Sequence, residues 1–398
     1  MEPDRFEKLT ILGNSAAFDL EAGGSCAFDA TPRLAVLQDR VSRAITRVSG
    51  VRGRSCRLLK ILQSNACSLN CNYCPNRAAA GRRSVSYSSE ELAAVFMLLY
   101  EQGEVDGLFL SSAVRGSPAG SMDSIVATAE ILRTRHRYRG YLHLKIMPGS
   151  PNDRIRRAVE LADRVSVNME APNQRALDQL APMKRLQDQI LPTMRFVRAL
   201  SSGSDLVPSG QTTQIIVGAG TETDREILQS AQQAYSEGSL ARVYFSAFEP
   251  VPGTPMEDAP PAPPLREHRL YQADFLLRRY SGAFHLGELV FEGNGGLSLD
   301  IDPKMAIALA NASEPVEVNT AAYAELLRVP GIGPKSARKI VHQRAENRLS
   351  SLAELRRAGV AVKRAAPFVL INGRRPSEAL AASIHQPTLP GLRLGQGP

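Results

Sequence analysis

Short apolar runs alternate with amphipathic stretches along most of the chain from Arg57 onward. The runs are rich in branched aliphatic and aromatic side chains, which is typical of buried strands. The stretches between them repeat their apolar residues at helical spacing. One of them carries Ser88 and Glu91 at the spacing of a capping box and Gly103 as a stop signal. The predicted strands are 57–64, 107–112, 141–147, 164–170, 212–218 and 241–248.

Six strand–helix repeats in series predict a parallel sheet, because parallel neighbours need crossover connections of about this length. Such crossovers are right-handed, so the series curls in one direction. Six units are fewer than the eight of a closed TIM barrel. The expected fold class is therefore α/β, a partial (β/α)6 TIM-like barrel followed by a small all-α domain.

A proline-rich stretch ends the repeating pattern. Seven prolines lie between Pro250 and Pro264, and proline is excluded from helix interiors and central strands. The final residues have too little apolar periodicity to pack, which predicts disorder. The expected organisation is an N-terminal extension over 1–56, the barrel core over 57–264, a linking helix and loop packing on the barrel over 265–302, short helices over 303–372 and a disordered tail over 373–398.

Composition places the 398 residues among ordinary soluble globular proteins, since 43% of them are apolar. The opening "MEPDRFEKLT" is not a signal peptide, and the sequence has no apolar run of about 18 residues. We therefore expect a cytoplasmic protein without a membrane partner. In a reducing compartment, clustered cysteines favour metal binding or redox chemistry over disulfides.

The positive charge is concentrated near the C-terminus. Thirteen lysines and arginines face five acids between Pro303 and Arg375, and that excess equals the whole net charge of +8. Residues 40–60 add seven basic side chains and no acid. A basic module indicates a polyanionic partner, most often nucleic acid. A solvated arginine-rich surface is the alternative.

The stretch "NACSLNCNYCPNR" holds Cys67, Cys71 and Cys74 within eight residues. A disulfide uses two thiols and a closed structural zinc site normally uses four ligands, so the count of three is informative. The cysteines follow the first predicted strand, and loops at this end of barrel strands carry the chemistry. A zinc site completed by a distant histidine, such as His136 or His143, remains the alternative.

These cysteines, with Tyr73 before the last of them, resemble the radical S-adenosylmethionine (radical SAM) signature. The resemblance implies that three thiolates hold a [4Fe–4S] cluster whose fourth iron binds the methionyl end of S-adenosylmethionine. An electron from the cluster then breaks the sulfonium C–S bond and yields a 5′-deoxyadenosyl radical. Cys26 and Cys56 are too few for a second cluster, so we expect them to be free or buried thiols.

The resemblance also implies contacts to S-adenosylmethionine at the ends of later strands. Radical SAM enzymes often carry a Gly-Gly-Glu-like stretch after the second strand, whereas this chain has "LFLSSA". The stretches "HLKIM", "SVNME" and "IIVGAG" follow in the expected order. The cofactor-binding residues that it implies are Ser111, Ser112, Lys145, Asn168, Glu170 and Val217. A structural salt bridge at Lys145 and a strand-capping role for Glu170 are the alternatives.

The second motif, "LLRVPGIGPKSARKIVHQR", resembles the helix–hairpin–helix of DNA glycosylases, ligases and polymerases. Its glycines allow a tight turn, and backbone N–H groups at the next helix can meet a phosphate. Contacts of this kind hold the nucleic-acid backbone without reading sequence. A role in protein association is the alternative. The residues implied in DNA binding are Gly331, Ile332, Gly333, Lys335, Ser336, Arg338 and Lys339.

The combination of such a barrel with a C-terminal helix–hairpin–helix resembles the radical SAM proteins assigned to DNA modification or repair. That family implies DNA as a partner, an external electron donor such as flavodoxin or ferredoxin, and an association with a uracil-DNA-glycosylase-like protein. The expected function is radical chemistry on a base or sugar of DNA, which must be flipped out or single-stranded. The alternatives are a radical SAM enzyme for RNA or protein and a DNA-binding redox sensor.

Overall fold

The computed structural model describes residues 3–16, 44–49, 55–280, 282–311 and 314–376. The chain divides into two compact units. Unit 1 comprises Met1–Glu222 and Gln229–Ala262, and unit 2 comprises Thr223–Leu228 and Pro263–Pro398. Cys26 and residues 377–398 of the predicted disordered tail lie outside the described residues, and the predicted domain boundaries stay predictions.

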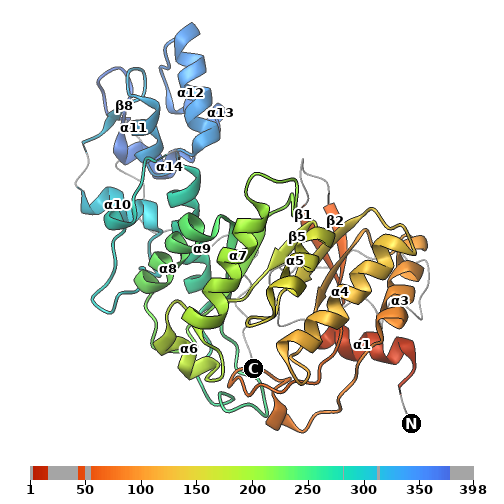
Figure 1. The fold of residues 1–398 in the computed structure, drawn as a ribbon. Helices are drawn as coiled ribbons and strands as arrows, with labels where there is room; N and C mark the ends of the chain where they lie inside the picture. Colours follow the sequence, from red (N-terminus) through yellow and green to blue (C-terminus); the bar gives the residue numbers. More distant parts are fainter. Residues whose placement is uncertain (1–2, 17–43, 50–54, 281, 312–313, 377–398) are drawn as a thin grey trace, which may run out of the picture. The chain divides into compact units, whose positions relative to one another are not determined.

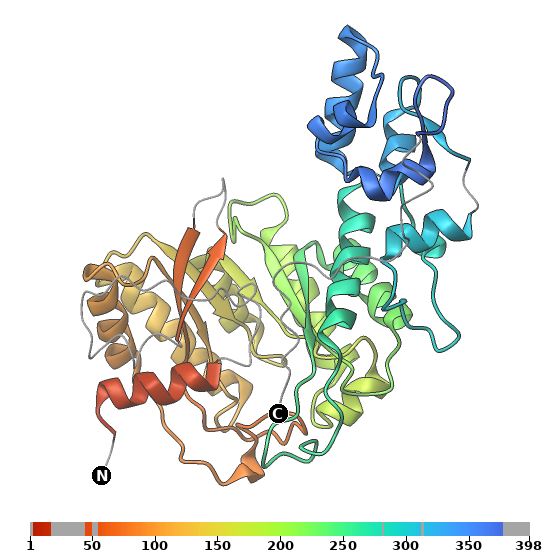
Figure 2. The same cartoon turned by 180° about the vertical axis from the view of Figure 1, so that it is seen from behind.

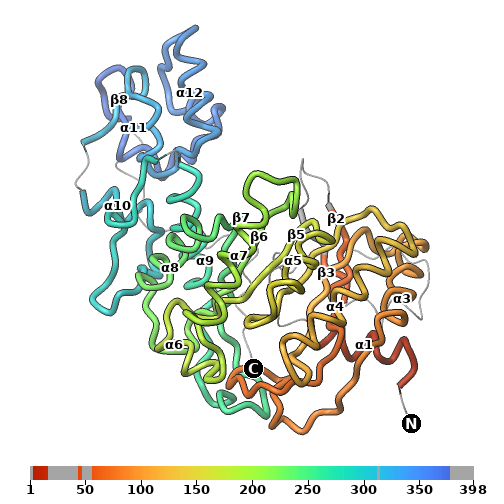
Figure 3. Tube along the Cα trace, in the orientation of Figure 1, coloured from red at the N-terminus to blue at the C-terminus, as the bar shows by residue number. Residues whose placement is uncertain are grey.

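The described residues of unit 1 form one seven-stranded sheet whose strands follow the order of the sequence, curled into a half-barrel (Figure 1). The six predicted strands all form, and they pair in parallel, which confirms the α/β fold class. Figure 3 follows the chain trace through them, with β5, β6 and β7 next to one another. They are β2 (Ser55–Leu62), β3 (Gly107–Ser111), β4 (Tyr141–Lys145), β5 (Arg164–Ser166), β6 (Gln211–Val217) and β7 (Leu240–Ala247).

A further strand, β1 (Ile45–Ser49), is absent from the sequence-based prediction and pairs antiparallel with β2. Figure 2 shows the two strands side by side. The stretch "ITRVS" is too short for its alternation to stand out within an arginine-rich segment. Its strand conformation depends on the hydrogen-bonding edge that β2 offers, which is a tertiary condition.

Helices α3, α4, α5 and α7 lie side by side along one face of the sheet (Figure 1). The predicted cap of α3 is present, because the Ser88 side chain accepts a hydrogen bond of 3.1 Å from the Glu91 amide. The helices of this unit are α1 (Arg5–Ala16), α3 (Ser89–Glu101), α4 (Pro118–Thr134), α5 (Asn152–Leu161), α6 (Gln174–Leu180), α7 (Leu191–Ser201) and most of α8 (Asp224–Gly238), with short turns η3 (Ala78–Ala80) and η4 (Leu186–Ile190).

Unit 2 is mainly helical, as its sequence predicts. A two-stranded parallel ladder, β8 (Val316–Glu317) with β9 (Val369–Leu370), departs from the all-α expectation and ties the ends of the hairpin region together. Across the described residues of both units, no helix has the length and apolar character that a membrane span requires. The helices are α9 (Pro264–Arg279), α10 (Pro303–Ala310), α11 (Tyr323–Arg328), α12 (Pro334–Glu346), α13 (Leu352–Arg357) and α14 (Val362–Ala365), with η5 (Leu286–Glu288) and η6 (Ala366–Phe368).

Candidate active site

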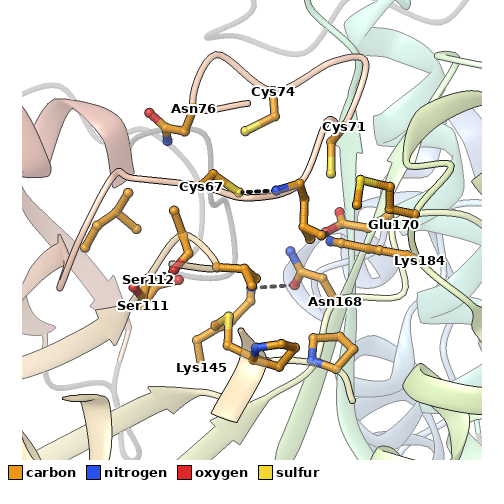
Figure 4. Close-up of a pocket in the computed structure, with 18 of the residues that line it drawn as sticks. Cys67, Cys71, Cys74, Asn76, Ser111, Ser112, Lys145, Asn168, Glu170 and Lys184 are labelled. Atoms are coloured by element: carbon orange, nitrogen blue, oxygen red, sulfur yellow. Dashed lines mark hydrogen bonds and ion pairs between the residues drawn. The ribbon is translucent and has the colours of Figure 1, made fainter. Parts of the chain in front are cut away.

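The three clustered cysteines lie on the loop after β2 and line one cavity at the carboxyl ends of the strands (Figure 4). All three thiols are free. The cysteine loop, residues 65–76, is fixed from two sides by hydrogen bonds. The Asn72 amide donates to the Leu180 carbonyl of α6 at 2.7 Å, and the Ser68 amide donates to the Val114 carbonyl beyond β3 at 2.7 Å. The folded chain therefore holds the loop against two later elements of the barrel.

Burial and mutual proximity act on the thiols together. Desolvation raises the pKa of Cys74 to about 12, opposed by a hydrogen bond from the Asn76 backbone and reinforced by Cys71 and Cys67. Desolvation also raises the pKa of Cys71, where Lys184 acts in the opposite direction. Three thiolates this close to one another need a cationic centre to stabilise them. The iron of a cluster meets that need, because a metal ion displaces the proton of a coordinating thiol.

Within the part of the chain that the structure describes, no three His, Cys, Asp or Glu side chains could hold one metal ion. A [4Fe–4S] cluster does not require such convergence, because each thiolate binds a different iron. The zinc alternative needs a histidine, and none of the described histidines lines the cavity. His143 instead hydrogen-bonds Ser166 at 2.9 Å and stacks on Phe109 inside the barrel. The donor set therefore fits a cluster held by three cysteines.

Five of the six predicted cofactor residues line the same cavity as the cysteines. They are Ser111, Ser112, Lys145, Asn168 and Glu170. The structure does not bring Val217 into the cavity: its side chain is fully buried, and the neighbouring Ile216 faces the cavity instead. The Lys145 ammonium donates to the Asn168 side-chain oxygen, so the lysine has a polar partner on the adjacent strand segment.

Sequence reasoning missed Lys184, which lies in the segment between α6 and η4. Its ammonium contacts the Glu170 carboxylate at 2.8 Å, and both side chains are largely buried. Desolvation would lower the pKa of Lys184, but the charges of Glu170 and Cys71 outweigh it and raise that pKa. Lys184 is therefore a cation at the cavity. The stretch "APMKRLQ" contains no motif that could have identified it.

Glu170 is held in an unusual backbone conformation, with a φ of 64°. Non-glycine residues rarely adopt positive φ, and such positions persist only where surrounding contacts determine them. Here the Glu170 amide donates to the Gln214 carbonyl and its carbonyl accepts from the Ile216 amide, at 2.9 and 2.8 Å. The carboxylate also hydrogen-bonds Tyr73 of the cysteine loop, whose pKa desolvation raises. Glu170 thus joins β6, the cysteine loop and Lys184.

The hairpin of unit 2 divides its predicted residues into buried and exposed groups. Gly331 has a φ of 85°, and a Cβ added to it would lie 2.6 Å from the Ala361 carbonyl oxygen. Ile332 is buried, as expected for a residue that fills the space between the helices. Ser336 is also buried, and its hydroxyl donates to the Gly359 carbonyl at 2.8 Å. Gly331 and Ser336 therefore pack the hairpin against the segment that follows α13.

The three cationic residues predicted to bind DNA lie on α12 and are exposed: Lys335, Arg338 and Lys339. Gly333 is the N-cap of this helix and Pro334 occupies its first turn. The first N–H groups of a helix have no intrahelical acceptor and attract anions. The helix start and the three side chains can together offer hydrogen bonds and positive charge to a phosphate.

Comparison with known proteins gives two domain matches. The profile of the Radical SAM superfamily matches residues 61–234, and that of the helix-hairpin-helix motif matches residues 311–358. A search of curated proteins found no match. The first region contains the three cavity cysteines together with Asn168, Glu170 and Lys184.

Solved structures similar to the chain include methylornithine synthase (PylB), at 16% identity and a TM-score of 0.44, covering 53% of this chain and 59% of that one. HydG, a maturase of the [FeFe]-hydrogenase, has 14% identity and a TM-score of 0.44, covering 54% and 48%. The radical S-adenosylmethionine methyltransferase TsrM from Kitasatospora setae has 17% identity and a TM-score of 0.39, covering 55% and 37%. The chain spans less than two thirds of the length of each of these proteins.

Proposed function

We propose that this chain, an enzyme of the radical SAM superfamily with a [4Fe–4S] cluster and S-adenosylmethionine as cofactors, generates a 5′-deoxyadenosyl radical and uses it on DNA. The observation that carries the proposal is one cavity lined by three free thiols and by the Glu170–Lys184 pair. The helix–hairpin–helix in the same chain supports DNA as the partner.

Each group of cavity residues has a distinct role in this mechanism. Cys67, Cys71 and Cys74 hold the cluster, which when bound supplies the electron that cleaves the sulfonium bond of S-adenosylmethionine. The amino-acid end of that cofactor carries an amino group and a carboxylate. Glu170 would accept hydrogen bonds from the amino group, and Lys184 would donate to the carboxylate. When Glu170 and Lys184 exchange each other for the groups of the cofactor, neither buried charge is left without a partner.

The remaining lining residues position the cofactor and exclude water. Asn168 and Lys145, which are hydrogen-bonded to each other, offer further polar groups in the cavity beside Glu170. Leu62, Ile146 and Ile216 form an apolar wall of the cavity. A primary carbon radical reacts with any accessible hydrogen donor, so a dry and shaped cavity protects it until the substrate is in place.

Unit 2 would hold DNA through phosphates. The N-terminus of α12 supplies backbone N–H groups, and Lys335, Arg338 and Lys339 supply charge beside them. Such contacts fix the duplex without reading its sequence. The target nucleotide must then be flipped out or single-stranded, because a stacked base cannot reach a site inside a barrel.

The test begins with anaerobic reconstitution, followed by dithionite and S-adenosylmethionine. We expect 5′-deoxyadenosine, formed slowly by the enzyme alone and faster with duplex or single-stranded DNA. If RNA and not DNA accelerated the formation of 5′-deoxyadenosine, the substrate would be RNA and not DNA. A cluster that is reduced without any 5′-deoxyadenosine would favour a DNA-binding redox sensor and refute the enzymatic proposal.

A further inference from the structure

A loop rich in arginine and alanine follows directly after the cysteine loop. The arginine loop, residues 77–83, reads "RAAAGRR" and contains the short turn η3. No residue of η3 is buried, and Ala78, Ala79, Gly81, Arg82 and Arg83 are exposed. Gly81 has a φ of 62° and no heavy atom near its would-be Cβ, so its surroundings are open. The loop presents its backbone and small side chains outward.

The arginine loop is hydrogen-bonded directly to the segment that carries the thiols. The Arg77 amide donates to the Cys74 carbonyl at 3.2 Å and the Ala78 amide donates to the Leu69 carbonyl at 2.9 Å. The Ala79 amide donates to the Asn70 side chain at 3.0 Å. The arginine loop therefore lies directly against the segment that carries the thiols. A protein that docks here meets no long side chain over the alanines and can approach the cluster closely.

The charge around this surface is positive. Residues 65–89 contain three arginines and no acid. Exposed Arg115 adds a fourth cation, on a loop whose Gly116 amide donates to the Ser68 hydroxyl at 2.9 Å. Arg83 pairs with Glu7 at 3.4 Å, with both side chains about half exposed. An exposed pair of this kind is weak and is readily exchanged for another carboxylate.

We propose that the arginine loop is the docking surface for an acidic one-electron carrier protein that reduces the cluster, an inference that rests on the proposed function. One electron passes from the reduced carrier to the cluster, so the carrier is oxidised by one electron and no atom is transferred. Electron transfer slows steeply with distance, and this surface offers a short path. Carboxylates on the carrier would be steered by the arginines.

The small extent of the surface agrees with this kind of partner. Electron-transfer encounters are weak and bury less area than stable complexes, so a few charges around a small-residue patch are sufficient. DNA phosphates would be attracted by the same arginines. The exposed cations of α12 already provide a phosphate site with a helix N-terminus, whereas the arginine loop has only a three-residue turn.

The test compares Arg82→Glu/Arg83→Glu with Arg135→Glu/Arg139→Glu in the cluster-loaded full chain. The control pair is exposed and lies between α4 and β4, at the other ends of the strands from the cysteines. Both variants replace two arginines by glutamate and therefore change the net charge by the same amount. The probe is an acidic flavodoxin, with affinity measured by calorimetry at low salt. We expect the loop variant to bind it roughly tenfold more weakly and the control to bind like the wild type. Arg82→Lys/Arg83→Lys should retain most of the affinity.

A second readout separates docking from chemistry. Dithionite is small and needs no docking surface, so dithionite-driven 5′-deoxyadenosine formation should be unchanged in the loop variant while the flavodoxin-driven rate falls. Equal flavodoxin affinity in loop variant and wild type, or equal loss in the control pair, overturns the docking surface. Loss of DNA affinity with intact flavodoxin binding also overturns it. An inactive wild type with dithionite would instead refute the proposed function, and the affinity measurement still decides the docking surface.

Discussion

The Lys184 ammonium lies 2.8 Å from the Glu170 carboxylate, on the wall of the cavity that also holds the three cysteines. If the pair binds the amino-acid end of S-adenosylmethionine, Lys184→Met and Glu170→Ala should each weaken its binding about tenfold or more, since a charge-assisted hydrogen bond is removed. Lys184→Arg should retain more affinity. Equilibrium dialysis with the labelled cofactor measures this.

Iron content distinguishes this role from a structural one. Neither residue is placed on the cluster, so both variants should keep the wild-type iron content. Each substitution also leaves one buried charge without its partner, and stability should fall by about 3 kcal/mol. A parallel fall in iron and cofactor binding would show that the pair supports the cysteine loop.

The cluster ligands form a separate prediction. Cys67→Ala, Cys71→Ala or Cys74→Ala should each abolish the oxygen-sensitive [4Fe–4S] cluster, because three thiolates are the minimum that holds it here. Cys56→Ala, on β2, should retain it, as should Cys26→Ala. Iron analysis and the visible absorption of anaerobically purified protein report the result. Four irons remaining without Cys71 would contradict the assignment, and about eight irons in the wild type would indicate a second cluster.

The exposed lysines of α12 should govern DNA affinity. Lys335→Glu/Lys339→Glu should weaken binding of every duplex sequence and lower the slope of log K against log salt by about 1 for each phosphate that the variant no longer neutralises. Arg348→Glu/Arg356→Glu makes the same change in net charge at exposed positions beyond α12 and serves as the control. Salt titrations by fluorescence anisotropy test this. Similar losses of affinity in both variants would point to general attraction by a basic surface.

The two hairpin glycines should differ in their tolerance of a side chain. Gly331→Ala meets the Ala361 carbonyl oxygen at 2.6 Å and requires a φ of 85°, so unit 2 should lose at least about 2 kcal/mol. Gly333 has a φ of −100°, and a Cβ added there would lie 3.8 Å from the Tyr280 hydroxyl, so Gly333→Ala should fold normally. Hydrogen exchange of the α12 amides, measured across a denaturant series, gives the difference in unfolding free energy between the two variants. Equal stability of the two variants would contradict this packing of the hairpin.

Buried Lys304 should make unit 2 more stable as the pH rises above 7. Desolvation lowers its pKa to about 7, with Asp302 opposing and Arg364 adding to the shift; its ammonium also donates to the Ile332 carbonyl and lies 4.8 Å from the Tyr280 ring centroid. Between pH 7 and 10 the unfolded chain keeps a proton that the folded unit has released. Stability therefore rises, by on the order of 1.4 kcal/mol per pH unit.

Lys304→Met removes the titrating group and provides the comparison for that pH dependence. Its stability should vary less between pH 7 and 10 than that of the wild type, and it should gain most at pH 6, where the wild type buries a charge. Denaturant series at several pH values, monitored by hydrogen exchange of the α12 amides, give the unfolding free energy against pH for the wild type and for Lys304→Met. Parallel curves for the two proteins would show that another group governs the pH dependence.

The sequence by itself determined those features that are encoded locally. Short apolar runs between amphipathic stretches predicted the six parallel strands, and Ser88 and Glu91 predicted the start of α3. The spacing of the three cysteines singled out the cysteine loop. These signals are readable because a strand, a cap or a short motif needs only neighbouring residues. The resemblance implied cofactor-binding residues on several strands, and five of them line one cavity because parallel strands bring their carboxyl ends to the same edge.

Only the tertiary structure decided the features that depend on partners distant in sequence. Strand β1 exists because β2 offers it an edge, and Ser336 turned inward because the Gly359 carbonyl accepts its hydroxyl. Ile216, and not Val217, faces the cavity because the alternation of β6 fixes which neighbour points inward. Lys184 joined the site because burial of the Glu170 carboxylate requires a cation nearby, and the fold supplied one from a loop without any motif.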